Sequence, residues 1–522
     1  MSLLRLPAFA LFLVILGLAM LGPALFAALT ADWKSGRSFL YAAIFTLFAA
    51  AVIGTLFSGA HKRPSIQVEL TVLVASWLII PALAAIPLAL ITPRIGVVGA
   101  WFEMVLCFTT TGSTSYLEPG QVEPAIHLWR GMVGWLGGLL TLAAAYVIMA
   151  PRRLGGFEVA ASAGTVSSGH AEFGGRLVTL DAATPGFGRR LNRAMRVILP
   201  IYAGITAALA GIFSMLGQGG LTGAIHAMSI VSTSGITPLA GGFAASSSLG
   251  IEMVAAVFLV LSATRLIYAR ASQAGSVTHW SQDPELRLMG ILVGLATLTL
   301  FLRHWFGALS IKVSENLTDA LAAIWGSAFT ALSFLTTTGF VSSMWQSARD
   351  WSGLSNPGLI LLALCAVGGG AATTAGGIKL IRAYALLRHG LRELDRIALP
   401  NGIIGVGSGM RGIMREGAFI AWAFIMLFIL SIFVVILGLT ITGMKFETAL
   451  VASIATLTNT GPAISVVLEG ETGFALLGVP ERLILAGSMI LGRIETLGVI
   501  ALFSIDFSHL LGRANHHQDS KQ

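Results

Sequence analysis

Ten apolar runs, each long enough to cross a bilayer, constrain what this chain can fold into. They lie at 6–30, 38–60, 67–92, 127–150, 196–217, 249–270, 286–307, 356–388, 416–441 and 481–505. A helix needs about 20 apolar residues to span the hydrocarbon core of a membrane. The chain is 55% hydrophobic and 11% charged, whereas a soluble domain carries about 25% charged residues. We therefore predict an all-α polytopic membrane protein.

Four shorter apolar runs, at 97–109, 220–232, 318–336 and 446–458, lie between the long ones. Each is about a dozen residues, too short to cross, so we expect re-entrant half-helices. They end in Thr109-Thr110-Thr111-Gly112, Ser232-Thr233-Ser234-Gly235, Thr336-Thr337-Thr338-Gly339 and Thr458-Asn459-Thr460-Gly461, whose glycines are 123, 104 and 122 residues apart. The order helix, half-helix, loop, helix is thus repeated four times after an extra N-terminal pair of helices.

The four Thr/Ser-Gly clusters predict a cation filter. Non-helical backbone at membrane depth survives only inside protein or beside a wet cavity, and an alkali cation is a partner for carbonyl oxygens there. Glycine lets successive carbonyls point the same way, and the clusters hold no carboxylate, which suits a monovalent ion. The predicted cation-binding residues, which the resemblance described below implies bind potassium, are Thr110, Thr111, Gly112, Ser113, Thr233, Ser234, Gly235, Ile236, Thr337, Thr338, Gly339, Phe340, Asn459, Thr460, Gly461 and Pro462.

A further glycine cluster interrupts the run at 356–388. The segment from Gly368 to Lys379 holds five glycines, and each weakens a helix by about 1 kcal/mol, so the helix should break there. The alternative is a kinked helix packed through small residues. Arg493 lies within the last run, where a charge must face a protein interior or a wet cavity. The alternative for Arg493 is an ion pair with a carboxylate such as Glu495.

The loops resemble the filters of the Trk/Ktr/HKT superfamily of potassium transporters. The stretches that match are Asn459-Thr460-Gly461-Pro462, similar to the Asn-x-Gly-Pro form of the Trk branch, Trp135-Leu136-Gly137-Gly138 and Gly492-Arg493-Ile494-Glu495. The resemblance spans nearly the whole chain, and the extra N-terminal helix pair is typical of the bacterial Trk-type membrane subunit. It implies four pseudo-repeats of helix, re-entrant pore loop and helix around one pore.

The same resemblance implies how the pore closes and what acts with it. An intramembrane gating loop lies below the filter, with an arginine beside it as a barrier to cations. The corresponding residues are Gly368, Gly369, Gly370, Thr373, Thr374, Gly376, Gly377, Lys379 and Arg493. Potassium is the transported ion, with no organic cofactor in this chain. The implied assembly is a homodimer gated by a cytosolic nucleotide-binding, TrkA-like subunit.

Other functions fit the pattern less well. One Thr-Thr-Gly alone would more often be a helix-packing site, but four copies at equivalent places favour a filter. A membrane enzyme needs a nucleophile and a base together, and no run pairs a His with a Ser or Cys at a plausible depth. The net charge of +8 comes from short connections without a basic domain, which argues against nucleic acid. A cation-coupled secondary transporter and a sodium-permeable member of the superfamily stay open, although Gly112 favours potassium over the sodium preferred by relatives with serine there.

Lys and Arg are distributed unevenly about the predicted spans. With the N-terminus inside, 22 of the 32 fall on the inner side, which predicts cytosolic termini. The resemblance to bacterial Trk-type subunits implies that the membrane is a bacterial inner membrane. The run at 6–30 exceeds the 7–15 or so apolar residues of a signal peptide, so we expect it to be retained. The predicted divisions are a helix pair at 1–64, pore repeats at 65–152, 195–275, 284–392 and 416–508, cytosolic loops at 153–194 and 393–415, and a cytosolic tail at 509–522.

The charge asymmetry predicts that the segment 151–196 is cytosolic and the segment 121–127 is external. Single cysteines placed in each segment and treated on intact cells with an impermeant thiol reagent test this orientation. The external segment should be labelled and the cytosolic one only after permeabilisation. The reverse pattern would contradict the topology and the pore with it.

Overall fold

The computed structural model describes residues 8–56, 66–116, 120, 122–149, 187–264, 283–306, 317–398, 408–468 and 473–494. Within these ranges every regular element is a helix, which confirms the all-α prediction. Eight helices of the described part are long and apolar enough to cross a membrane. The chain is therefore a multi-pass membrane protein.

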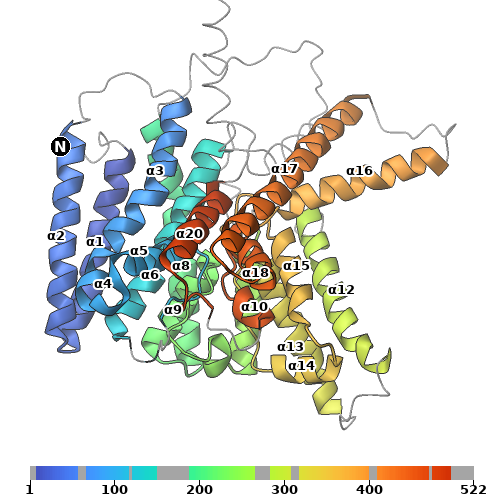
Figure 1. Cartoon of the computed structure of the whole chain (residues 1–522), viewed down its shortest axis with the longest axis horizontal. Coiled ribbons are helices and arrows are strands. Elements are labelled where there is room, and N and C mark those ends of the chain that lie inside the picture. Colours follow the sequence, from blue (N-terminus) through green and yellow to red (C-terminus); the bar gives the residue numbers. More distant parts are fainter. Residues whose placement is uncertain are drawn as a thin grey trace, which may run out of the picture.

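The helices fall into an N-terminal pair and four successive groups (Figure 1). The pair is α1 (Ala8–Leu29) and α2 (Trp33–Leu56). The first group comprises α3 (Ile66–Ala84), α4 (Ile86–Ile91), η2 (Pro93–Ile95), α5 (Gly96–Phe108), α6 (Pro124–Ala144) and η4 (Ala145–Met149), and the second α8 (Phe187–Met215), α9 (Gly220–Ser232), η6 (Phe243–Ser246) and α10 (Leu249–Ser262). The third comprises α12 (Pro284–Phe306), α13 (Leu317–Leu335), α14 (Trp345–Ser352), α15 (Gly358–Val367) and α16 (Leu380–Ala398), and the fourth α17 (Ser408–Ile441), α18 (Phe446–Leu457), α19 (Ala463–Val467) and α20 (Val479–Ile494).

Seven of the ten predicted spans are among the eight long apolar helices. The runs at 249–270 and 481–505 are described only as far as Thr264 and Ile494. The run at 356–388 is not one helix, because α15 ends at Val367 and α16 begins at Leu380. The glycines between them break the helix where the sequence indicates.

The third half-helix is longer than a dozen residues, and its predicted bounds of 318–336 already span 19 residues. The helix α13 has 19 residues and is itself long and apolar enough to count as a span. Its first half contains no glycine or proline, whereas α5 and α9 begin at a glycine. Its other end still stops before the buried Thr336–Gly339 loop, as the other half-helices do.

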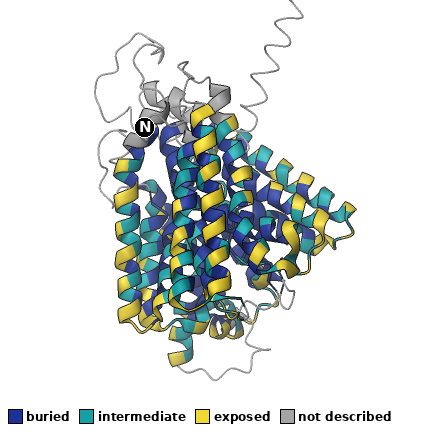
Figure 2. Ribbon diagram, turned by 90° about the vertical axis from the view of Figure 1, so that its left-hand side faces the viewer, coloured by how far each residue is buried: buried dark blue, intermediate teal, exposed yellow. Residues whose placement is uncertain are grey.

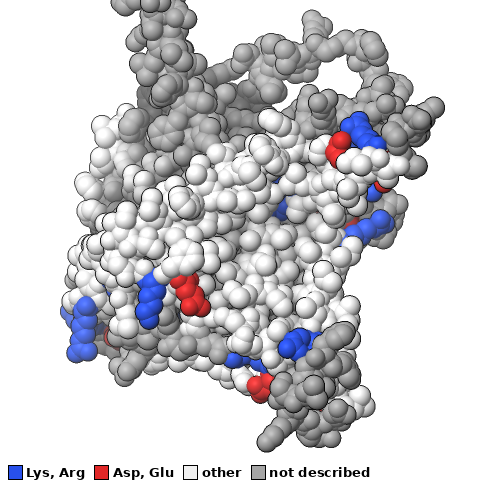
Figure 3. Space-filling view, turned by 45° about the vertical axis from the view of Figure 1, so that its right-hand side comes forward, with Lys and Arg blue, Asp and Glu red and all other residues white. Residues whose placement is uncertain are grey.

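The outer surface of the described helices is apolar. Large hydrophobic side chains such as Leu25, Phe48 and Phe433 are more than half exposed, and Figure 2 shows exposed residues along the outward faces of the helices. Charged side chains are sparse on the face drawn in Figure 3 and gather mostly toward its lower and right-hand edges. An exposed apolar belt of this kind suits a bilayer rather than water.

The half-helix α5 is the most deeply enclosed of the four and positions the first Thr-Gly loop. It packs against α3, α6 and α20, and the rings of Trp77 and Phe108 lie 4.9 Å apart. In α6, Gly137 lies directly against the end of α5: a β-carbon on it would be 1.8 Å from the carbonyl oxygen of Phe108. The helix after this loop can approach this closely only because residue 137 has no side chain.

Gly137→Ala should therefore destabilise the fold, by about 1–3 kcal/mol as is usual for overpacking, because the clash is with backbone. The measurement is the thermal unfolding midpoint of the purified protein in detergent. Gly211→Ala in α8 is the matched control, since a β-carbon there meets nothing within 4 Å. Equal midpoints for the two variants would contradict the close approach of α6 to α5.

Candidate functional site

All four half-helices end in the same backbone turn. The second residue of each cluster adopts a left-handed conformation, with φ of 49° at Thr110, 51° at Thr233, 59° at Thr337 and 54° at Asn459. The N–H of the next residue then bonds to the carbonyl five residues earlier, in the pairs Thr111–Leu106, Ser234–Ser229, Thr338–Ser333 and Thr460–Ala455. This is the hydrogen bond that closes a helix at a left-handed C′ residue. The sequence repeat is thus also a conformational repeat.

A hydrogen bond between two side-chain hydroxyl groups stabilises each turn. The first and third residues of every cluster hydrogen-bond through their side-chain oxygens, at 2.7 Å for Thr109–Thr111, 3.0 Å for Ser232–Ser234, 3.2 Å for Thr336–Thr338 and 3.4 Å for Thr458–Thr460. These polar side chains are buried and have partners within their own loop. The Thr and Ser residues therefore shape the loops as well as supplying oxygen atoms.

The four cluster glycines join the loops into one closed ring. A β-carbon on each glycine would collide with or crowd the next loop in order: 1.9 Å from Gly112 to the Ser234 carbonyl oxygen, 2.1 Å from Gly235 to the Thr338 carbonyl oxygen, 3.0 Å from Gly339 to Pro462, and 2.8 Å from Gly461 to the Gly112 carbonyl oxygen. The first loop therefore touches the second, the second the third, the third the fourth, and the fourth the first. Residues far apart in sequence meet around one axis.

The fourth loop closes the ring differently from the others. Gly112, Gly235 and Gly339 have left-handed φ values of 72°, 64° and 77°, whereas Gly461 does not adopt this conformation. Instead the N–H of Gly461 donates to the Thr111 carbonyl oxygen at 2.6 Å. The side chain of Asn459 also reaches the first loop, donating to Thr111 Oγ1 at 3.0 Å.

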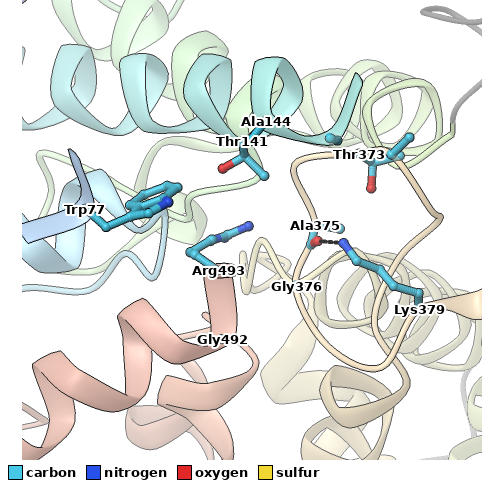
Figure 4. Close-up of a pocket in the computed structure, with 11 residues that line it drawn as sticks. Trp77, Thr141, Ala144, Thr373, Ala375, Gly376, Lys379, Gly492 and Arg493 are labelled. Atoms are coloured by element: carbon cyan, nitrogen blue, oxygen red, sulfur yellow. Dashed lines mark hydrogen bonds between the residues drawn. The ribbon is translucent and has the colours of Figure 1, made fainter. Parts of the chain in front are cut away.

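The glycine-rich segment 368–379 folds into a compact loop within the protein. Its ends are clamped where Ile378 N donates to Ala366 O at 3.0 Å and Lys379 N donates to Val367 O at 2.9 Å. Inside the loop, Lys379 Nζ donates to the carbonyl of Ala375 (Figure 4). The backbone N–H of Ala371 is tethered to Glu285 Oε1 of α12 at 3.0 Å.

This loop contacts the clusters on the side where the half-helices end. Thr233 Oγ1 donates to Thr374 Oγ1 at 3.0 Å, and the N–H of Gly376 donates to Thr337 Oγ1 at 2.8 Å. A β-carbon on Gly376 would lie 2.0 Å from the Thr458 carbonyl oxygen. The second, third and fourth clusters thus rest directly on the glycine-rich loop.

Arg493 joins the first cluster to the same loop. Its Nε donates to the Thr109 carbonyl at 2.5 Å, its Nη1 to the Thr374 carbonyl at 2.5 Å, and its Nη2 to the Thr110 hydroxyl. The side chain is 6% exposed. Arg493, Gly376 and Lys379 border a cavity of about 20 Å³ (Figure 4), roughly the room that one water molecule needs. Glu495, the alternative ion-pair partner, lies outside the described residues.

The predicted filter residues converge on the ring, although not every side chain faces it. Ile236 lies against Gly134 of α6, and Phe340 stacks on Phe243 with ring centroids 4.5 Å apart. In the glycine-rich loop, Gly370 N bonds to Ala263 O at 3.2 Å. A β-carbon on Gly369 would also lie 3.8 Å from Ala263 Cβ, and Thr373 Oγ1 donates to the Gly370 carbonyl at 2.7 Å.

Three buried charged residues beside the ring were not predicted from the sequence. Glu103 and Arg130 form an ion pair of 2.6 Å at 0% and 1% side-chain exposure. Glu252 of α10 accepts from Trp325 Nε1 at 2.8 Å and from Ser343 N at 2.6 Å. The signal that singled out Arg493, a charge within an apolar run, also applies to these residues.

Comparison with known proteins agrees with this architecture. The family model described as TrkH, cation transport protein, matches residues 35–509. Trk system potassium uptake protein TrkH of Halomonas elongata is 28% identical, covering 95% of this chain and 97% of that protein. The protein of the same name from Salmonella typhimurium is 27% identical, over 91% and 92%.

A solved structure resembles this one over its full length. The crystal structure of the potassium transporter TrkH from Vibrio parahaemolyticus superposes with a TM-score of 0.75 at 25% identity, covering 96% of this chain and 98% of that one. The family match covers most of the sequence, and the ring of loops lies within it. The chain belongs to the TrkH family of cation transport proteins.

Proposed function

We propose that this protein takes up potassium through a filter formed by the ring of four loops, in the inner membrane of a bacterium. The observation that carries the proposal is the cyclic contact of Gly112, Gly235, Gly339 and Gly461, each against the next loop. Four loops that meet around one axis can surround an ion with oxygen atoms from every side. The names of the relatives, Trk system potassium uptake proteins, support potassium as the ion.

The chemistry of the ring suits an alkali cation. Its oxygen atoms come from backbone carbonyls and hydroxyls, and the four clusters contain no carboxylate. Neutral oxygens can replace the hydration shell of a monovalent ion, whereas a divalent ion such as Ca²⁺ usually needs carboxylate ligands. The fixed turns and the hydroxyl pairs hold these oxygens in place without the ion having to organise them.

Ion flux into liposomes that contain only the purified chain tests this proposal. Potassium and rubidium should permeate faster than sodium and lithium. Flux that runs down the potassium gradient without a proton or sodium gradient would identify a channel-like pathway. A strict requirement for a second ion gradient would favour the coupled transporter. Equal permeation of sodium would place the chain among sodium-permeable members. The absence of alkali-cation flux in both the parent and the Arg493→Ala variant would contradict the proposal.

Gly112→Ser should lower the ratio of potassium to sodium permeability. A side chain there is strained at φ 72°, and its β-carbon would lie 1.9 Å from the Ser234 carbonyl, so the ring must distort. We expect a loss of roughly tenfold, equivalent to about 1.4 kcal/mol of discrimination. Gly443→Ser is the matched control, since it has φ 96° but meets nothing within 4 Å. An unchanged ratio in a folded Gly112→Ser protein would remove this residue from the filter.

We also propose that the glycine-rich loop and Arg493 close the pathway beneath the filter. The loop hydrogen-bonds to Thr233 and Thr337, and Arg493 bonds to both the loop and the first cluster. A loop at this place obstructs the path, and a fixed positive charge raises the barrier for a cation. Opening requires the neutral bonds to Thr233 and Thr337 and the charge-assisted bonds of Arg493 to be exchanged, which a local movement of the loop can accomplish.

Arg493→Ala, or deletion of Ala371 to Ala375, should raise potassium flux in the absence of any cytosolic partner. We expect roughly a tenfold rise or more, since removing the charge lowers the barrier by about 1.4 kcal/mol or more. The potassium preference should persist, because the four glycines are unchanged. Arg388→Ala, on the exposed side of α16, is the control. If both variants insert normally and leak no faster than the parent, the gate lies elsewhere.

The assembly follows from the family resemblance. We propose that two copies associate, each with its own pore, and that a cytosolic nucleotide-binding subunit of the TrkA type controls the glycine-rich loop. The loop continues directly into α16, which extends away from the main body of the described helices (Figure 1). A partner that moved α16 would therefore pull on the gate.

A further inference from the structure

We infer that the Glu103–Arg130 ion pair is a positioning device that sets the ion selectivity of the ring by holding the outer ends of the first two loops together. The inference rests on the proposed filter function. Glu103 lies in the half-helix α5 and Arg130 in α6, so both are outside the cluster itself. Both are buried, in a structure where most polar groups near the ring are neutral.

Glu103 holds the chain just after the first filter glycine. Its Oε2 accepts from both the backbone N–H and the hydroxyl of Ser115, each at 2.7 Å. Its Oε1 accepts from Arg130 Nε at 2.6 Å and from Thr114 Oγ1 at 3.2 Å. Four donors surround one carboxylate, so the segment beyond Gly112 has little freedom to shift.

Arg130 extends these contacts to the second loop, and we call the Glu103–Arg130 pair with its hydrogen bonds the brace. Its Nη2 donates at 2.7 Å to the carbonyl of Ser113, the residue after the filter glycine Gly112. Its Nη1 makes a longer hydrogen bond of 3.4 Å to the carbonyl of Thr237, two residues after Gly235. One planar guanidinium thus fixes the spacing between the exits of two neighbouring loops.

In two other repeats, the position equivalent to Glu103 also holds a polar side chain that binds the segment after the filter glycine. The residues nine positions before the filter glycines are Glu103, His226, Thr330 and Ala452. His226 Nε2 hydrogen-bonds Thr237 Oγ1 at 3.0 Å, and Thr330 Oγ1 accepts from Ser342 N at 3.3 Å, so each binds the segment after its own glycine. Ala452 has no polar side chain. Of these four equivalent positions, the one in the first loop, Glu103, carries a carboxylate.

Stability alone does not explain a charged pair at this place. Replacing a buried ion pair by neutral residues of similar size is often neutral or stabilising, because both charges lose their hydration. Charge-assisted hydrogen bonds are, however, shorter and more directional than neutral ones. Because the pair acts on the carbonyls of Ser113 and Thr237, its geometry is transmitted to the oxygens nearest the filter. The pair thus links the first two loops, whereas the third loop is held separately by Glu252, which accepts from Ser342 Oγ and Ser343 N, each at 2.6 Å.

The test compares potassium and sodium permeability in liposomes for two variants. The double substitution Glu103→Gln/Arg130→Gln removes both charges without leaving either one buried alone. Ser115→Ala keeps the ion pair and removes one hydroxyl from Glu103. We expect the permeability ratio to fall roughly tenfold in the double variant and roughly threefold in Ser115→Ala, in line with the loss of charge-assisted hydrogen bonds. Thr46→Val is the control, because it removes a buried hydroxyl from the N-terminal helix pair.

The ratio distinguishes positioning from a purely structural role. Loss of folded protein lowers potassium and sodium flux equally, whereas a displaced carbonyl changes their ratio. If the double variant does not fold, the permeability ratio of Ser115→Ala decides between a positioning role and a purely structural one. An unchanged ratio in a folded variant, with Gly112→Ser still shifting it, would overturn the brace and leave the filter intact. Absence of selective cation flux in both the parent and the Arg493→Ala variant would overturn the proposed function itself.

Discussion

Backbone that leaves the helical state inside a membrane must find hydrogen-bond partners within the protein or in a wet cavity. This constraint shapes the five non-helical segments that meet at the centre of this molecule. Each half-helix is closed by its own left-handed turn and hydroxyl pair. Other backbone N–H groups find their partners in a neighbouring segment. Gly461 N donates to the Thr111 carbonyl, and Gly376 N donates to the Thr337 hydroxyl. The carbonyls that remain are those a cation can satisfy.

The two sides of the ring are stabilised by different kinds of interaction. On the side of the half-helix ends, neutral oxygens of Thr109, Thr110 and Thr374 surround one arginine. On the other side, a carboxylate and a guanidinium neutralise each other and brace the chain after the glycines. A charge that is matched can hold a structure without affecting a passing cation, whereas a charge held by neutral dipoles acts as a barrier to it. Under the proposed function, this difference separates a brace that stays in place from a loop that moves.

The sequence alone predicted the features that repeat. The four clusters, the helix break at the glycines and the burial of Arg493 each follow from local composition, and the structure has all of them. The cyclic order of the loops was not predictable, because it depends on which distant glycines meet. The different backbone conformation of Gly461 was not predictable either, because it depends on a hydrogen bond to Thr111, which is distant in sequence. Glu103 and Arg130 could have been found, because a charge in an apolar run is itself a signal.

The most direct test of the central claim is the position of a bound ion. Crystals grown or soaked with thallium(I), an electron-rich substitute for potassium, would reveal it by anomalous diffraction. The ring predicts density on the axis enclosed by Gly112, Gly235, Gly339 and Gly461, bordered by backbone oxygens from all four loops. Thallium bound elsewhere, with this axis empty in protein that still transports potassium, would contradict the filter.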